Sequence, residues 1–291
     1  MDKLKDENLF YIGGIVRDEI LGIKNFDLDF CYQGNAINFA NNKKLNIIKQ
    51  NEDLGTVRII YNDIEIDIAS TREEAYPQKG HLPKITSIGC PLINDLKRRD
   101  FTMNAMAKNS IRGELIDFFN GKNDIKEKKI RILHKESFID DPSRILRALK
   151  FSVRFNFELE EQTKFLQDEY LNNIINYDMS YHRIKKELVD TFKLNKAEAF
   201  DKFINNKIYR LLSAKDYNLN INSSEIQETI ENNIFEYPYM LYLAMFDSSK
   251  LQLTRGEKRI IEWIERLKLQ KPTNNTPKES IAIAKLMRIT V

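Results

Sequence analysis

Two aspartates near the N-terminus, Asp27 and Asp29, carry the first chemistry that the sequence suggests. They lie at alternate positions of FDLDFCY, a segment with the two-residue period of a β-strand. Because side chains at i and i+2 of a strand point to the same face, the two carboxylates are expected to lie close together. Such a pair suits Mg²⁺, which prefers oxygen ligands and phosphate partners. Taken alone, two aspartates at this spacing are more often exposed strand residues, so the neighbouring residues must decide.

The segment before the aspartates, YIGGIVRDEILG, supplies groups that bind phosphate. Gly13 and Gly14 end an apolar run predicted to be a strand and begin a predicted helix, so backbone N–H groups can face a triphosphate there. Arg17 lies one turn into that helix, where its guanidinium can reach the same phosphates. A lone Gly-Gly pair is usually a plain turn. Together with the aspartates, these residues indicate a site for a nucleotide and a metal ion.

Two later segments offer a third carboxylate and more arginines. Asp67 lies on IEIDIAS, another alternating segment, where a metal ligand and an ordinary polar strand position are equally good interpretations. Arg98, Arg99 and Asp100 come directly before the apolar FTMNAMA. These charged residues are therefore expected to be held in place by the buried segment that follows them, rather than to lie in an exposed turn.

A predicted helix at DDPSRILRALKF has two contrasting sides. Asp141 followed by Pro142 is typical of a helix N-terminus, and capping alone accounts for this aspartate. At 100° per residue the apolar side chains fall on one side and the basic ones on the other: Ile145, Leu146, Leu149 and Val153, against Arg144, Arg147 and Lys150. The basic side is either a solvated helix face or a surface for an anion, and contacts to an RNA backbone there would be sensitive to salt.

The sequence periodicity divides the chain into two kinds of structure. Residues 9–120 alternate predicted strands and helices, with a Pro- and Gly-bearing loop at AYPQKGHLPK. After residue 135 the pattern is helical, with helices expected at 141–155, 160–175, 180–193 and 196–205. We expect an α/β head with a small mixed sheet, followed by an all-α neck and body. The boundaries predicted for these three parts are 1–120, 121–190 and 191–291.

The composition, with 42% hydrophobic and 31% charged residues, is that of an ordinary globular protein. The formal net charge of +3 is small, so a nucleic-acid surface must come from local clusters of basic residues. Two cysteines do not make a disulfide framework, and three widely spaced histidines argue against a zinc site. The N-terminal residues form no signal-peptide core, and no eighteen apolar residues run together. We therefore expect a cytoplasmic protein that does not enter a membrane.

Six segments resemble, in order, the motifs of class II tRNA nucleotidyltransferases. They are GGIVRDEILG with DLD, DIASTREEAY, GHLPK, DLKRRDFTMNAMA, IDFFNGKNDI and DDPSRILRALKF. These enzymes are the CCA-adding enzymes and bacterial poly(A) polymerases of the DNA polymerase β-like nucleotidyltransferase superfamily. The resemblance covers about residues 9–195, and six motifs in the right order make it specific.

The resemblance implies template-independent addition of C and A to the 3′ end of tRNA, from CTP and ATP, with Mg²⁺ as cofactor. Asp27 and Asp29 match the aspartates that bind the metal ions, and Asp67 matches an acidic residue on the neighbouring strand. These three carboxylates are expected to be catalytic. Nucleotide binding is implied for Gly13, Gly14, Arg17, Arg99, Asp141, Arg144, Arg147 and Lys150.

In the family, the residues that match Asp141 and Arg144 act as a protein template for the base. Cytosine and adenine each present an amino donor beside a ring-nitrogen acceptor, so a carboxylate and a guanidinium can pair with them. Uracil and guanine present the opposite pattern. Each buried polar group left unpaired costs about 1–3 kcal/mol, which is enough for useful discrimination.

Some residues differ from the family pattern, and several alternatives stay open. Asp140 stands where glutamate is usual, Lys150 stands where arginine is common, and only about a hundred residues follow SYHRIKKEL. A CC-adding enzyme, an A-adding enzyme or a poly(A) polymerase would share the same site residues. A catalytically silent RNA-binding relative and a phosphohydrolase fit less well, because the full residue set is present and no His-Asp metal pair is found. We expect a monomer or a homodimer.

Overall fold

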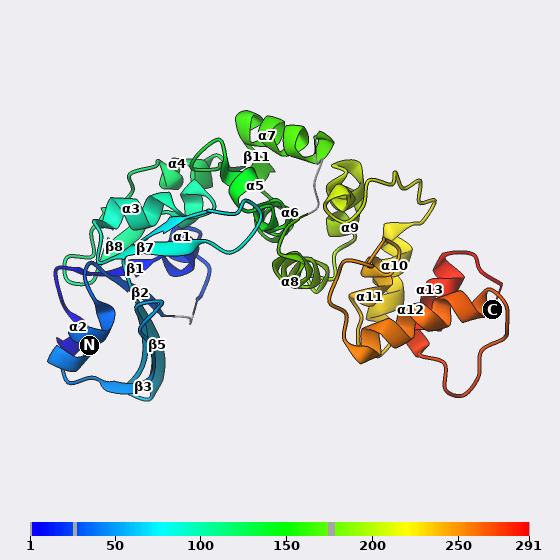
Figure 1. Ribbon diagram of the computed structural model, residues 1–291, viewed down its shortest axis with the longest axis horizontal. Helices are drawn as coiled ribbons and strands as arrows, with labels where there is room; N and C mark the ends of the chain where they lie inside the picture. The colour runs from blue at the N-terminus through cyan, green and yellow to red at the C-terminus, as the bar shows by residue number, and fades with distance from the viewer. Residues whose placement is uncertain (1, 26–27, 174–177, 291) are drawn as a thin grey trace. The chain divides into compact units, whose positions relative to one another are not determined.

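Seven strands of the first 120 residues form one sheet in the structure, a computed structural model that describes residues 2–25, 28–173 and 178–290 (Figure 1). The strand order is β3-β4-β5-β2-β1-β8-β9, with β2 and β5 parallel and the other neighbours antiparallel. The sheet consists of β1 (Leu9–Ile12), β2 (Asp29–Tyr32), β3 (Asn46–Asn51), β4 (Thr56–Tyr61), β5 (Ile64–Ser70), β8 (Ala107–Asn109) and β9 (Leu115–Ile116). This mixed sheet confirms the predicted α/β head.

Two hydrophobic cores cover the two faces of the sheet. Phe30 and Cys31 are successive residues of β2 and therefore point to opposite faces. Phe30 packs with α2 (Ala36–Asn42), and Cys31 packs with α3 (Leu92–Lys97). The other helices of this part of the chain are α1 (Gly14–Ile20), α4 (Gly121–Lys126) and α5 (Ser137–Asp140).

At β4 and β5 only the face toward α2 is buried. Ile66 and Ile68 of β5 lie in the core with α2, whereas Asp67 between them is exposed. Arg58 of β4 is exposed in the same way between two buried residues. This alternation leaves a charged sheet face open to a ligand.

Two short strand pairs lie outside the seven-stranded sheet. The antiparallel pair β6 (Arg72–Ala75) and β7 (Lys84–Ile88) encloses the loop predicted from AYPQKGHLPK. The parallel pair β10 (Lys129–Ile130) and β11 (Glu158–Leu159) joins two segments that lie far apart in the sequence. The prediction did not include β3, because five of its six residues are exposed and show no two-residue alternation.

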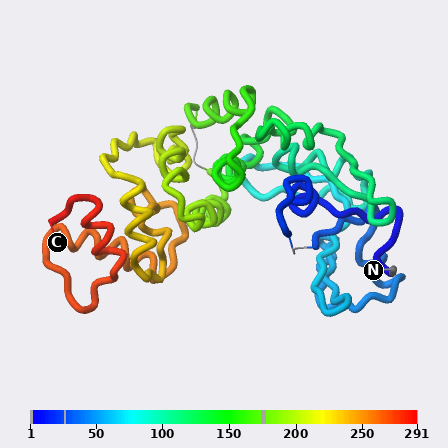
Figure 2. The backbone as a smooth tube through the Cα atoms, turned by 180° about the vertical axis from the view of Figure 1, so that it is seen from behind, coloured from blue at the N-terminus to red at the C-terminus, as the bar shows by residue number. Residues whose placement is uncertain are grey.

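From residue 141 onward the structure is helical apart from β11, as predicted (Figure 2). The apolar side predicted for 141–155 is buried: Ile145, Leu146, Leu149 and Val153 are all less than 4% exposed. Aromatic side chains from successive helices fill the core, and Phe192 stacks on Tyr242 with ring centroids 5.3 Å apart. The helices are α6 (Ser143–Phe155), α7 (Glu161–Asn172), α8 (Tyr181–Phe192), α9 (Ala197–Asn205), α10 (Ser223–Glu231), α11 (Met240–Leu243), α12 (Arg255–Leu267) and α13 (Lys278–Leu286).

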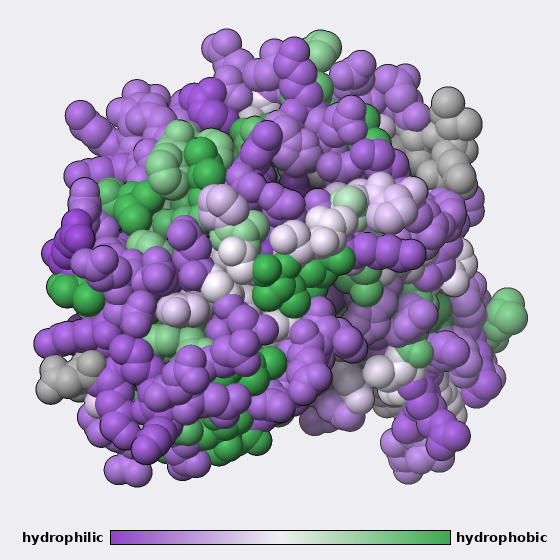
Figure 3. Space-filling view, turned by 60° about the vertical axis from the view of Figure 1, so that its left-hand side comes forward, coloured by the Kyte–Doolittle hydropathy of each residue, from purple (hydrophilic) through white to green (hydrophobic). Residues whose placement is uncertain are grey.

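The contacts within the chain divide it into two units. We call residues 1–140 with 158–163 the head unit, and residues 141–157 with 164–291 the helical unit. The finer division into head, neck and body stays a prediction. None of the helices in the described part of the chain is long and apolar enough to cross a membrane. In the space-filling view hydrophilic residues cover most of the visible face, and hydrophobic residues appear in separate patches (Figure 3).

Candidate active site

A cavity of about 470 Å³ lies against strands β2 to β5 of the head unit. Five of the residues predicted to form the site line it together: Gly13, Gly14, Asp29, Asp67 and Arg99. They come from the β1–α1 turn, from β2 and β5, and from the segment after α3. The sheet therefore brings a glycine turn, two carboxylates and a guanidinium to one place.

The two carboxylates of this cavity lie side by side. Asp29 and Asp67 are register partners on the parallel strands β2 and β5, and both are exposed. Neighbouring strands lie about 4.8 Å apart, so two aspartates in register present their oxygens to one small region. Oxygen donors of this kind fit a hard divalent cation.

Asp27, the first aspartate of the predicted pair, lies outside the described residues. Among the residues that are described, no group of three or more acidic, His or Cys side chains forms a possible metal site. Asp29 and Asp67 are the two predicted carboxylates that the described residues place in the cavity, and their binding of a metal stays a prediction.

A guanidinium already occupies one of these carboxylates. Arg58 of β4 donates from Nε and Nη2 to the two oxygens of Asp67 at 2.7 and 2.8 Å. These hydrogen bonds and the charge of Asp67 raise the pKa of Arg58. Both oxygens of Asp67 are therefore engaged by Arg58 in this structure, and its role as a metal ligand stays a prediction.

The glycine turn adopts a conformation that other residues avoid. Gly13 has φ 70° and ψ −121°, values typical of the first central position of a type II′ turn, where glycine is strongly preferred. A Cβ at this position would lie 2.9 Å from Nη1 of Arg99. Glycine therefore allows the Arg99 guanidinium to lie directly against the turn.

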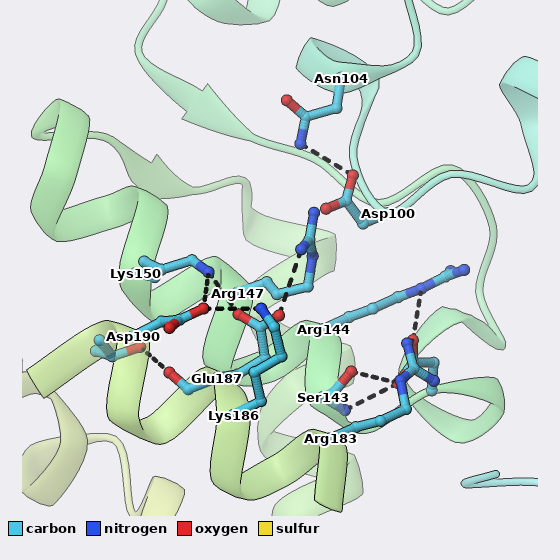
Figure 4. Close-up of polar contacts among 12 residues, drawn as sticks. Asp100, Asn104, Ser143, Arg144, Arg147, Lys150, Arg183, Lys186, Glu187 and Asp190 are labelled. Carbon is cyan, nitrogen blue, oxygen red and sulfur yellow. Dashed lines mark hydrogen bonds and ion pairs between the residues drawn. The ribbon is translucent and has the colours of Figure 1, made fainter. Parts of the chain in front are cut away.

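Arg17 does not line the cavity. Its side chain is instead held inside the head unit by polar contacts. Its guanidinium is buried, pairs with Asp18 at 2.7 Å, and donates to the side-chain oxygen of Asn104 at 2.6 Å. Asn104 in turn donates to Asp100 at 3.0 Å (Figure 4). The expectation that Arg17 reaches the phosphates directly therefore has no support in this arrangement, and whether it touches a nucleotide stays a prediction.

Arg98 and Arg99 have different surroundings although they are adjacent. Arg98 pairs with Asp95 at 2.8 Å and with Glu74 at 2.9 Å, so it ties α3 to β6. Arg99 pairs with Asp95 at 3.1 Å through Nη2, and its buried Nε has no acceptor among the described residues. Burial alone would raise the pKa of Asp95, but the charges of Arg99 and Arg98 hold it below its usual value. Asp95 therefore stays ionised and fixes both arginines.

The remaining predicted residues belong to the helical unit, where Asp141 and Arg144 are buried. Oδ1 of Asp141 accepts from the backbone N–H of Ser143, the first residue of α6, at 3.2 Å and from its hydroxyl at 2.6 Å, while the N-cap position of the helix is Pro142. Oδ2 accepts from Arg183 of α8 and lies 3.8 Å from Nε of Arg144. These contacts hold the carboxylate in one orientation.

Arg147 and Lys150, predicted as part of a basic stripe, face α8 (Figure 4). Glu187, itself buried, accepts from Lys150 and pairs with Arg147 at 3.5 Å. Lys150 also lies 3.7 Å from Asp190. The stripe is therefore partly neutralised by a neighbouring helix, and its role in nucleotide binding stays a prediction.

Sequence reasoning missed three groups beside these residues. Arg58 lies at an alternate position of TVRIIY, opposite Asp67, so the strand pattern contained a signal for it. Glu187 and Arg183 lie 37 and 42 residues from their partners Lys150 and Asp141, and no local pattern connects such positions.

Comparison with known proteins places this site in a family context. Residues 9–131 match the model of the poly A polymerase head domain. The chain is 38% identical over 201 residues to the A-adding tRNA nucleotidyltransferase of Aquifex aeolicus, which covers 67% of this chain and 23% of that protein. It is 40% identical over 163 residues to the A-adding enzyme of Halalkalibacterium halodurans, covering 54% of this chain and 38% of that one. The chain thus spans less than half the length of these curated relatives.

Solved structures match over almost the whole chain. An apo form of a CCA-adding enzyme superposes with a TM-score of 0.83 and 28% identity, over 97% of this chain and 76% of that one. A complex of CCA-adding enzyme with CTP gives a TM-score of 0.76 and 28% identity, over 97% and 74%. A tRNA nucleotidyltransferase with a primer tRNA and an ATP analogue gives 0.69 and 26%, over 91% and 84%. The chain has the fold of CCA-adding enzymes over almost its whole length, and its residues 9–131 carry a poly A polymerase head domain.

Proposed function

We propose that this protein adds nucleotides to the 3′ end of tRNA from CTP and ATP, without a nucleic-acid template. The observation that carries the proposal is the joint position of Asp29, Asp67, Gly13 and Arg99 in one cavity of the head unit. It combines a cation site with donors for phosphate, which nucleotidyl transfer requires. The names of the relatives give the substrate: they are tRNA nucleotidyltransferases, and solved neighbours hold CTP, an ATP analogue or a primer tRNA.

In the proposed reaction the 3′-hydroxyl oxygen of the RNA attacks the α-phosphorus of the nucleotide. The bond from that phosphorus to the bridging oxygen breaks, pyrophosphate leaves with the electron pair, and the proton of the attacking hydroxyl passes to water. Arg99 and the backbone N–H of Gly14 hold the leaving phosphates by hydrogen bonds and charge, whereas the N–H of Gly13 donates to the carbonyl of Met106 at 3.3 Å and fixes the turn. Asp95 keeps Arg99 in place for this task.

Mg²⁺ is the proposed cofactor, held by Asp29, Asp67 and Asp27. Carboxylate oxygens are the ligands that Mg²⁺ prefers, and Asp67 would take part after Arg58 releases one of the two oxygens that it now binds. When bound, the metal supplies two effects: it lowers the pKa of the attacking hydroxyl and neutralises charge on the departing phosphates. The carboxylates orient the metal and hold it against the cavity wall.

Asp141 and Arg144 are the proposed base-selecting pair. Three donors, from Ser143 and Arg183, bind the carboxylate of Asp141, which has about four acceptor positions. One acceptor position remains for the amino group of cytosine or adenine. Arg147 and Lys150 are proposed to support this pair through α6 rather than by their own charge, because Glu187 binds both.

One observation favours a narrower function within the same class. Three relatives at 38–40% identity are named A-adding enzymes, whereas five relatives named CCA-adding enzymes are 27–33% identical. Addition of the final A alone is therefore the second candidate. Either activity places the protein where tRNA matures, in the cytoplasm.

Incorporation of labelled CTP and ATP, separately and together, into tRNA transcripts lacking CCA, CA or the final A tests the proposal. Addition of C and A that stops at one CCA supports the main function, and addition of A only to transcripts ending in CC supports the second. A long A ladder would instead identify a poly(A) polymerase. No incorporation on any transcript would refute the proposal.

A substitution connects the activity to the cavity. We predict that Asp29→Asn lowers the incorporation rate by about 100-fold or more, because a metal site is worth several kcal/mol to the transition state. Binding of tRNA is expected to stay nearly unchanged. Asp53→Asn is the matched control, since Asp53 is also an exposed aspartate of the head unit but does not line the cavity. Equal rates in the two variants would contradict the assignment of Asp29.

A further inference from the structure

Four charged side chains lie in one row across four neighbouring strands of the head unit. Asp29 of β2 is in register with Asp67 of β5, Asp67 with Arg58 of β4, and Arg58 with Lys49 of β3. All four line the cavity, and all four are exposed. The row begins with two carboxylates and ends with two cations. Because neighbouring strands lie about 4.8 Å apart, each charged side chain lies close to the next one in the row.

The basic half is produced by an irregularity in the sheet. The register of β3 on β4 shifts between Ile47 and Lys49, so that two residues of β3 oppose one of β4. A bulge of this kind re-aims a side chain and is common beside active sites. Here it sets Lys49 directly opposite Arg58.

Like charges directly opposite each other destabilise a strand pair. Arg58 is compensated by Asp67, but Lys49 has no ion-pair partner among the described residues. Two cations held together at the wall of a cavity are an arrangement that a bound anion stabilises. A guanidinium beside an ammonium is also the combination that binds phosphate oxygens well.

The strand order indicates which phosphate group of the two reactants Lys49 and Arg58 would bind. The glycine turn and Arg99 lie at β1, on the side of Asp29 away from β5, whereas Arg58 and Lys49 lie on the other side of Asp67. In nucleotidyl transfer the attacking oxygen and the leaving oxygen stand roughly in line on opposite sides of the phosphorus. If pyrophosphate leaves toward Arg99, the RNA must approach from the side of β4 and β3.

We propose that Lys49 and Arg58 bind the last phosphodiester of the RNA 3′ end and thereby place its terminal hydroxyl at the carboxylates. The inference rests on the proposed function, since it assigns the second reactant of that reaction. Arg58 binds one of two anions: Asp67 in this structure, and the phosphodiester when RNA is bound. Exposed ion pairs are weak, so exchanging one anion for the other costs little.

The test is a binding cycle that needs no chemistry. Fluorescence anisotropy without nucleotide gives the Kd of labelled tRNA lacking its final A, as a function of KCl concentration. Lys49→Gln is the main variant, because it leaves the Arg58–Asp67 pair intact. We expect its Kd to rise about fivefold, and the slope of log Kd against log [KCl] to fall by about 0.7 to 1. The KM values for ATP and CTP are expected to stay unchanged.

A chemical change in the RNA locates the contact. A neutral methylphosphonate at the last linkage removes the charge that Lys49 is proposed to bind. Wild-type protein is expected to lose about fivefold in affinity for this RNA, and Lys49→Gln to lose nothing further. Arg112→Gln is the matched control: it removes one exposed arginine of the head unit, paired with Glu7 at 3.0 Å, that does not line the cavity. Its loss on the modified RNA should equal that of the wild type.

Two results would overturn the inference. If Lys49→Gln raises the KM for nucleotide and leaves the Kd of tRNA unchanged, the basic pair binds the nucleotide phosphates instead. If the losses from the protein variant and the RNA change simply multiply, Lys49 does not contact the last linkage. A wild-type protein that binds tRNA and shows the coupling but incorporates no nucleotide would refute the proposed function alone, and the phosphate contact would stand.

Discussion

At the scale of single residues, the position of Gly13 controls how Arg99 meets the cavity. A Cβ atom added at residue 13 would lie only 2.9 Å from Nη1 of Arg99, which is too close for an undisturbed contact. Because this contact involves the end of a flexible side chain, a methyl group there would displace Arg99 rather than break the fold. A change at Gly13 should therefore affect nucleotide binding more than stability.

We predict that Gly13→Ala raises the KM for ATP by about tenfold, the effect of losing one charged phosphate contact. Gly22→Ala is the control, because Gly22 has the same φ of 70° but nothing within 4 Å of its Cβ position. Both variants should lose about 1 kcal/mol of unfolding free energy through the unfavourable φ, measured by urea titration. Equal KM values in the two variants would show that Arg99 does not bind the nucleotide.

Base choice is the second property expected to depend on one residue. We predict that Arg144→Ala lowers the preference for CTP and ATP over UTP and GTP by about tenfold, with a smaller effect on the rate with ATP. The physical reason is the loss of a buried donor worth about 1–3 kcal/mol to the correct base. Competition assays with all four nucleotides measure this, with Arg154→Ala, an exposed arginine of the same helix, as control. Unchanged selectivity would leave Arg144 with a structural role only.

Five of the sixteen residues that line the cavity were predicted from the sequence, and strand alternation, which places polar residues on one face, accounts for some of them. Asp67 and Arg58 follow this rule between buried neighbours. Arg17 did not, since its partner is the adjacent Asp18 and no spacing rule indicates whether such a pair points inward. The partner of Asp141 could not be predicted either, because Arg183 comes from another helix.

At the scale of elements, the α6–α8 contact depends on the charges at its centre. Glu187 of α8 binds Lys150 and Arg147 of α6, and both Glu187 and Lys150 have little exposure. The basic stripe of α6 looked like a ligand surface in the sequence, because the acidic partner lies on a different helix. Helix periodicity predicts which side of a helix is polar but not what that side contacts.

We predict that Glu187→Gln lowers the unfolding free energy of the helical unit by about 1–3 kcal/mol, because the buried carboxylate is lost and the partly buried ammonium of Lys150 is left poorly paired. Lys186→Ala is the control on the same helix: its exposed pair with Asp190 at 2.9 Å should be worth about 0.5 kcal/mol or less. Urea unfolding followed by circular dichroism measures both. If the two variants lose the same free energy, the α6–α8 contact does not depend on Glu187.

At the scale of the whole molecule, the sequence predicted the change from α/β to helical structure but not the exact division of the chain. Residues 158–163 return to the head unit because β11 pairs with β10, a contact between segments nearly thirty residues apart that no local pattern shows. Each unit has its own core and its own natural probe. Both cysteines lie in the head unit, and the single tryptophan, Trp263, lies in α12 of the helical unit.

These probes allow the two units to be followed separately during unfolding. Burial raises the pKa of Cys31, so its thiol reacts with Ellman's reagent only when the head unit opens. Trp263 is 9% exposed, so its fluorescence reports the helical unit. We predict that Glu257→Gln, which removes a buried carboxylate bound by Lys185 and Tyr239, shifts the tryptophan midpoint in urea by the equivalent of about 1–3 kcal/mol. The thiol midpoint should stay in place, whereas a common shift of both would mean that the chain unfolds as one cooperative unit.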